Sequence, residues 1–137
     1  MTSPLATGSR TFAEAIDVIE ETYEFMLAYA AQGRRREEDD AGAGIRERLL
    51  RAEAALAIIA SATAQDVGAE GQGGGAAGEF LDVVKQDAAR ASAAFRFVTA
   101  QPTIGSKIVD NLNASTHVRT LLTDLFLLDE ALKISGI

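Results

Sequence analysis

The stretch FLDVVKQDAARASAAFRFV, residues 80–98, decides the fold class of this chain. Its apolar residues recur at steps of three and four, the spacing that places side chains on one face of an α-helix. The residue before a proline avoids helical dihedral angles, so this helix is expected to end before Pro102. The buried face that the spacing predicts consists of Phe80, Val84, Ala88, Ala91, Phe95 and Val98.

Three other segments have the same spacing. The first is expected to begin at Thr11, because Thr-Phe-Ala-Glu has the form of a capping box with Glu14, and to stop at Gly33. The helices are expected over residues 11–32, 45–63 and 118–132, with a short helical piece at 107–112. The N-cap of the last helix is expected at Asn113, Ser115 or Thr116. The buried positions predicted in the three long segments are Phe12, Ile16, Ile19, Tyr23, Met26, Ala30, Ile45, Leu49, Ala52, Leu56, Ile59, Thr63, Val118, Leu121, Leu122, Leu125, Leu128 and Leu132.

The segments between these helices predict the domain organisation. Residues 34–44 are a charge block, RRREEDD, that runs into Ala-Gly-Ala-Gly, and they are too polar to bury. Gly68 to Gly78 contains six glycines, a composition typical of a flexible loop. Residues 1–10 are expected to be a flexible N-terminus. Residues 1–137 then form one all-α domain, an antiparallel four-helix bundle with a short extra helix before the last long helix.

Composition limits the classes of function. The chain has 137 residues with 13 basic and 20 acidic ones, a formal net charge of −7 that disfavours nucleic acid and anionic membranes as partners. Cysteine is absent, which removes disulfides and thiol chemistry and fits a reducing compartment, so a cytoplasmic location is expected. No stretch approaches the roughly 18 apolar residues of a membrane span, and no signal peptide is recognised.

Two acidic residues fall inside the predicted apolar faces. Asp87 lies among the apolar positions of residues 80–98, and Asp129 lies among the leucines of the last helix. A buried carboxylate is costly unless it finds a cation or water, so we expect Arg48 or Arg90 to pair with these acids.

His117 is the single histidine and lies at the edge of the last apolar face. We interpret it as a half-buried packing residue. The alternative is a phosphorylatable histidine on a helical bundle. The lysine and glycine typical of phosphotransfer domains are absent after it, in His-Val-Arg-Thr-Leu-Leu.

The acidic side of the first helix gives the alternative, catalytic hypothesis. The segment Ile-Glu-Glu-Thr-Tyr-Glu-Phe, residues 19–25, followed by EEDD at 37–40, resembles the metal-binding motifs of MazG-type nucleoside triphosphate pyrophosphohydrolases. The resemblance implies a Mg²⁺ cofactor, which favours hard oxygen ligands. The ligands that it implies are Glu20, Glu21, Glu24, Glu37 and Asp40. The other interpretation of these acids is a solvated helix face.

A second line of apolar residues favours a binding role. Phe25 and Tyr29 lie off the main face of the first helix, and Phe126 and Leu127 point away from that of the last. Contiguous exposed apolar side chains mark contact surfaces. The other interpretation is that some of these residues cap the ends of the core or lie under the charge block or the glycine-rich loop. The preferred hypothesis is therefore a small acidic, non-catalytic interaction protein of adaptor or chaperone type, without metal or cofactor, that self-associates as a dimer and binds a protein partner.

Overall fold

The computed structural model describes residues 4–39, 44–69 and 75–134, and this part of the chain is all-helical. The prediction of an all-α fold is thereby confirmed, with no strand among the described residues. The elements, in chain order, are α1 (Pro4–Ala31), the short 3₁₀ helix η1 (Glu37–Asp39), α2 (Ile45–Ala60), α3 (Ala76–Thr99), α4 (Ser106–Ala114) and α5 (Thr116–Leu132).

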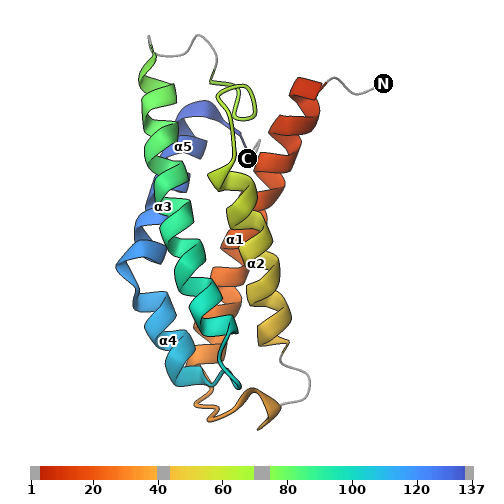
Figure 1. Cartoon of the computed structure of the whole chain (residues 1–137), viewed down its shortest axis with the longest axis vertical. Helices are drawn as coiled ribbons and strands as arrows, with labels where there is room; N and C mark the ends of the chain where they lie inside the picture. Colours follow the sequence, from red (N-terminus) through yellow and green to blue (C-terminus); the bar gives the residue numbers. More distant parts are fainter. Residues whose placement is uncertain (1–3, 40–43, 70–74, 135–137) are drawn as a thin grey trace.

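The helices lie side by side along the long axis of the molecule (Figure 1). In that view α1 and α3 run downward, whereas α2, α4 and α5 run upward. Helix α2 packs against both α1 and α3, α4 packs mainly against α1, and α5 packs mainly against α3. Ser115, with φ −58° and ψ 129°, separates α4 from α5 because that ψ value is not helical.

One apolar core draws on every long helix. Its residues follow the predicted spacing in α2, α3 and α5, so the amphipathic pattern accounts for which faces are buried. The largest fully buried side chains are Tyr29, Phe12, Ile16, Met26, Ile45, Leu49, Leu56, Ile59, Ile104, Leu121, Leu125 and Val84.

The first helix begins earlier than predicted. It starts at Pro4, so Thr11 lies inside α1 and does not cap it, and residues 4–10 are helical. Proline is well suited to the first helical position, which needs no amide hydrogen bond. The predicted stop holds at the other end, where Gly33 follows α1 with φ 67°, a conformation that favours glycine.

Residues 61–69, which follow α2, form a turn that packs against the core. Helix α2 ends at Ala60, and Thr63, predicted on its buried face, is exposed in the turn that follows. Thr63 and Asp66 exchange hydrogen bonds between side chain and backbone, at 2.9 and 3.2 Å. This turn directs Val67 and Ala69 into the core. Only residues 70–74 of the glycine-rich segment lie outside the described residues, and Gly78 is part of α3.

Candidate functional site

The most elaborate polar structure lies at one end of the molecule, where the segment after α1 meets the loop between α3 and α4. We call this end the base, defined by residues 29–46 and 99–106; it is the lower end in Figure 1. Ser106 accepts a hydrogen bond at its Oγ from the Arg34 amide (2.8 Å) and donates one to the Tyr29 carbonyl (2.6 Å). The Ser106 amide donates in turn to the Arg34 carbonyl at 2.7 Å.

An ion pair completes the base. Arg46 Nη2 lies 2.7 Å from Glu37 Oε1, and the same guanidinium donates to the carbonyls of Thr99 (2.5 Å) and Gln101 (2.9 Å). Glu37 also accepts from the Ile104 amide at 3.1 Å. Hydrogen bonds to ionised groups are stronger than neutral ones, so this pair holds the α3–α4 loop against η1 and α2.

Glycine is required where the two segments touch. A Cβ atom on Gly105 would overlap the carbonyl oxygen and carbon of Arg35, so only a residue without a side chain fits here. This close approach places the start of α4 directly on the segment that follows α1. Both segments therefore contribute to one surface.

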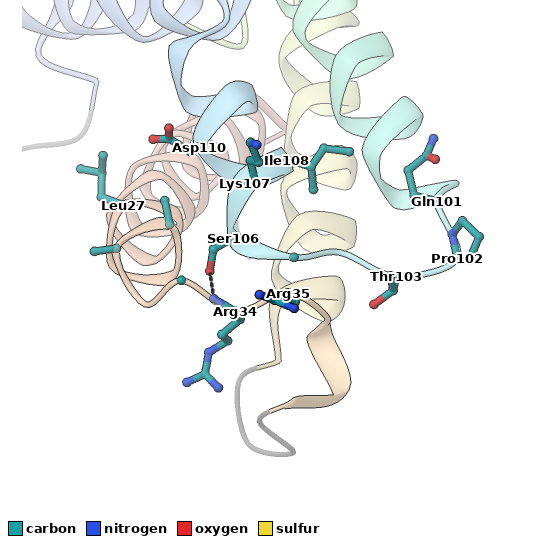
Figure 2. Close-up of a pocket in the computed structure, with 14 residues that line it drawn as sticks. Leu27, Arg34, Arg35, Gln101, Pro102, Thr103, Ser106, Lys107, Ile108 and Asp110 are labelled. Carbon is teal, nitrogen blue, oxygen red and sulfur yellow. Dashed lines mark hydrogen bonds between the residues drawn. The ribbon is translucent and has the colours of Figure 1, made fainter.

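A groove of about 950 Å³ opens on that surface. Apolar and polar residues both line it, and Figure 2 shows Lys107 and Asp110 between Leu27 and Ile108. The apolar lining comes from Leu27, Ala30, Ala31, Pro102 and Ile108. The polar lining includes Arg34, Arg35, Gln101, Thr103, Ser106, Lys107 and Asp110.

The cations of the groove have different surroundings. The Arg34 guanidinium lies 5.8 Å from the centre of the Tyr29 ring and donates from Nε to the Gln32 side chain at 2.5 Å, so it is held against the protein. Arg35 and Lys107 are exposed, and in Figure 2 they lie on either side of Ser106. Two exposed cations thus lie at the rim of an apolar hollow in a chain of net charge −7.

A second polar cluster joins α3 to α5. Asp87 is buried and receives Arg90, whose Nη1 lies 3.1 Å from Asp87 Oδ1. Asp124 of α5 lies against it, and its Oδ2 atom is buried with no hydrogen-bond partner among the described residues. Burial, a hydrogen bond to Asp87 and the charge of Asp87 raise the pKa of Asp124 to about 7. The sequence pattern identified Asp87 but missed Asp124, whose place between Leu121 and Leu128 on the helix was the available signal.

The other buried-polar candidates have different positions from those expected. The Arg48 guanidinium lies 4.5 Å from the centre of the Phe25 ring. Asp87 pairs with Arg90 instead. Asp129 is partly exposed. Partial burial is the main cause that raises the pKa of Glu20, followed by the negative charges of Asp17 and Asp129. His117 is exposed, so the interpretation as a half-buried packing residue is wrong.

The carboxylates of the MazG-like hypothesis are dispersed. Glu20, Glu21 and Glu24 lie on α1, whereas Glu37 lies beyond its end and pairs with Arg46. Glu20 is eleven residues before the end of α1, roughly 16 Å along the axis. Across residues 4–39, 44–69 and 75–134 no group of three or more acids, histidines or cysteines could hold a metal ion. Asp40 lies outside the described residues.

The predicted interface residues separate into two groups. Tyr29 is 1% exposed and donates from its hydroxyl to the Ile104 carbonyl at 2.5 Å, so its expected place on an exposed line is wrong. Phe25 is half-buried, stacked on Tyr29 at 6.4 Å between ring centres and covered by Arg48. Phe126 and Leu127 are 54% and 59% exposed. The apolar line of α1 is therefore used inside the molecule, and that of α5 is not.

In comparisons with known proteins, no family model, no curated protein and no solved structure matches the chain. A search of the described helices for a membrane span also finds none that is long and apolar enough.

Proposed function

We propose that this chain is a non-catalytic interaction protein that self-associates as a dimer through the outer face of α3 and α5. We further propose that α1, α2, α3 and the column formed by α4 and α5 together make an antiparallel four-helix bundle. The observation that carries the proposal is the exposure of large apolar residues on α3 and α5. They are Val83 (45%), Phe97 (68%), Phe126 (54%) and Leu127 (59%).

The α3–α5 seam brings two of these residues together. Asp87 and Asp124 lie against each other, which fixes the level of one helix relative to the other. Val83 lies one turn before Asp87, and Leu127 lies about one turn after Asp124. Since α3 and α5 run in opposite directions (Figure 1), both steps lead toward the same end of the molecule. Val83 and Leu127 thus flank the seam as neighbours, and exposed apolar clusters of this kind mark contact surfaces.

Charge supports a second copy of the chain as the occupant. Two molecules of net charge −7 repel each other, so they can approach closely only over a face without unpaired acids. Arg90 pairs with Asp87 on this seam, Lys133 Nζ lies 2.7 Å from Glu130 Oε1, and a raised pKa reduces the charge of Asp124. Thr123, one turn before Leu127, is exposed and uncharged. A twofold dimer places the same face of each copy in contact, as most homodimers do.

The mass of the protein in solution tests the proposal. Sedimentation equilibrium at micromolar concentration is expected to give a dimer for the natural sequence. Leu127→Glu is expected to give a monomer of unchanged helicity, because it places a charge in the contact. The matched control is Leu50→Glu on α2, a leucine of similar exposure (50%) away from the seam, which should remain dimeric. A natural protein that is monomeric up to about 100 μM would overturn the proposal.

We propose in addition that the chain binds another protein. The absence of cysteine is in keeping with a reducing compartment such as the cytoplasm, where a small adaptor of this composition would act. We find no feature of the described residues that favours the Mg²⁺-dependent hydrolase.

A further inference from the structure

The groove at the base has a composition that the self-association proposal does not use. Its volume of about 950 Å³ lies at the upper end of the range of small-molecule sites. Such sites are typically apolar with a few convergent polar groups. Here the lining combines the apolar side chains of Leu27 and Ile108 with the cations Arg35 and Lys107.

The walls of the groove are held in place by buried polar contacts. Tyr29, Arg34 and Ser106 join α1 to α4 through the hydrogen bonds described above, and Gly105 allows the two backbones to touch. A hollow between rigidly joined segments needs no rearrangement to accept a ligand, so little ordering entropy is lost on binding. The groove is therefore a preformed feature of the fold.

Charge decides the class of ligand. Arg35 and Lys107 are exposed cations from two segments that the fold brings together. Asp110 lies near Lys107 in Figure 2, and the three cations Arg34, Arg35 and Lys107 outnumber it among the lining residues. An anionic head group near Arg35 and Lys107 would gain charge-assisted hydrogen bonds. An apolar tail would cover Leu27, Ala31 and Ile108, whose burial from water is favourable.

We infer that this groove binds a small amphipathic anion, with a carboxylate or phosphate head at Arg35 and Lys107 and an apolar tail along α1 and α4. The inference is independent of the dimer, because the base and the α3–α5 seam use different residues.

Calorimetric titration with three probes that share one tail tests the inference: decanoate, decyl phosphate and decyltrimethylammonium, each below its micelle concentration. The anions are expected to bind with Kd on the order of 10–500 μM, and the cation at least about tenfold more weakly. Amide chemical shifts should change at residues 27–35 and 101–110. Binding by decanoate alone would indicate a carboxylate ligand, and binding by decyl phosphate alone a phosphate ester.

Two sets of variants locate the head and the tail. Arg35→Gln with Lys107→Gln should weaken anion binding at least about tenfold, because each removes a charged donor. The matched control is Arg119→Gln with Lys133→Gln, which removes the same charge from exposed positions on and just after α5 and should leave Kd unchanged. Ala31→Trp, which fills the apolar side, should abolish binding without loss of helicity.

Three results would overturn the inference. They are equal affinity for the cationic and anionic probes, equal loss in the two charge-removing double variants, and no heat or shift changes with any probe. Because Leu127→Glu should bind the anions normally, failure of the groove and failure of the dimer are distinguishable.

Discussion

At the scale of single residues, the carboxyl pair of Asp87 and Asp124 stands out because two acids share one site. Asp124 lies against a buried carboxylate that already pairs with Arg90. Like charges so close cannot both ionise cheaply, and the proton that Asp124 keeps can be donated to Asp87. Protonation therefore stabilises the contact between α3 and α5.

The pH dependence of stability follows from this raised pKa. Asp124 has a pKa of about 7 in the folded protein and of about 4 when unfolded. Between those values the folded state holds a proton that the unfolded state releases, so the free energy of unfolding falls as pH rises and levels off above pH 7. Partial exposure reduces the full effect, and we expect a loss of about 1–2 kcal/mol.

Asp124→Asn should remove this dependence. The amide carries no charge and can donate to Asp87, so the variant should be about 1–2 kcal/mol more stable than the natural protein at pH 8 and nearly equal at pH 4. Urea unfolding at pH 4, 6 and 8 measures both. Asp82→Asn, an exposed acid on α3, the helix that carries Asp87, is the control. Parallel pH profiles for natural protein and Asp124→Asn would show that the pair does not share a proton.

Gly105 gives a second prediction at this scale. A methyl group there would overlap the Arg35 carbonyl, so Gly105→Ala should lower the free energy of unfolding by about 1–3 kcal/mol. Gly78 of α3 is the control, since a Cβ there meets nothing within 4 Å and Gly78→Ala should stabilise the helix by about 0.5–1 kcal/mol. Chemical denaturation of both variants checks the opposite signs. A neutral Gly105→Ala would mean that the segments can separate at little cost.

At the scale of elements, two helix starts with serine differ in what the hydroxyl does. Ser106 opens α4 and bridges Arg34 to Tyr29, whereas Ser115 occupies the N-cap position of α5 and makes no side-chain capping bond. The sequence predicted a cap near Ser115, and the backbone position agrees. Ser115 makes no capping hydrogen bond with its side chain, so its hydroxyl does not contribute to the start of α5 in the way the sequence predicted.

Paired substitutions separate these roles. Ser115→Ala should change the free energy of unfolding by less than about 0.5 kcal/mol, below the typical loss of about 1 kcal/mol for a capping serine. Ser106→Ala should cost about 1–3 kcal/mol, because it removes the two hydrogen bonds that Oγ makes with the Arg34 amide and the Tyr29 carbonyl. Thermal unfolding followed by circular dichroism measures both. Equal losses would contradict the distinction.

Helix positions could be predicted from sequence, because amphipathic spacing is local. The buried faces of α2, α3 and α5 follow from steps of three and four alone. The starts of the helices were predicted less well. A capping pattern predicted that the first helix begins at Thr11, whereas α1 begins at Pro4, and proline also suits the first helical position. The first turn of α3, which begins at Ala76, was not predicted, because the alanines and the glycine before Phe80 include no large apolar residue that would reveal helical spacing.

The groove and the base could not be predicted, because their residues are far apart in the chain. Tyr29 contacts Ile104 across 75 positions and Arg34 contacts Ser106 across 72. Local pattern predicted Tyr29 to be exposed, since nothing near it in sequence indicates the loop that covers it. The charge block at 34–40 was likewise predicted to be solvated, but Glu37 pairs with Arg46.

At the scale of the whole molecule, net charge opposes the proposed dimer. Each copy carries −7, and salt screens repulsion between them. Raising NaCl from 50 to 500 mM should therefore tighten the dimer by about threefold, whereas an interface held by ion pairs would weaken. Sedimentation at the two salt concentrations checks the direction. Weaker association at high salt would count against an apolar contact at Leu127.

The hydrogen bonds of the base also have a consequence for how the chain acquires its structure. Arg46 and Tyr29 depend on acceptors at Thr99, Gln101 and Ile104, which are synthesised long after them. Closing so long a loop is entropically costly and comes late in folding. A nascent chain that stops before Thr99 thus lacks the acceptors for Arg46 and Tyr29. The base can form only after the residues from Thr99 onward have been synthesised.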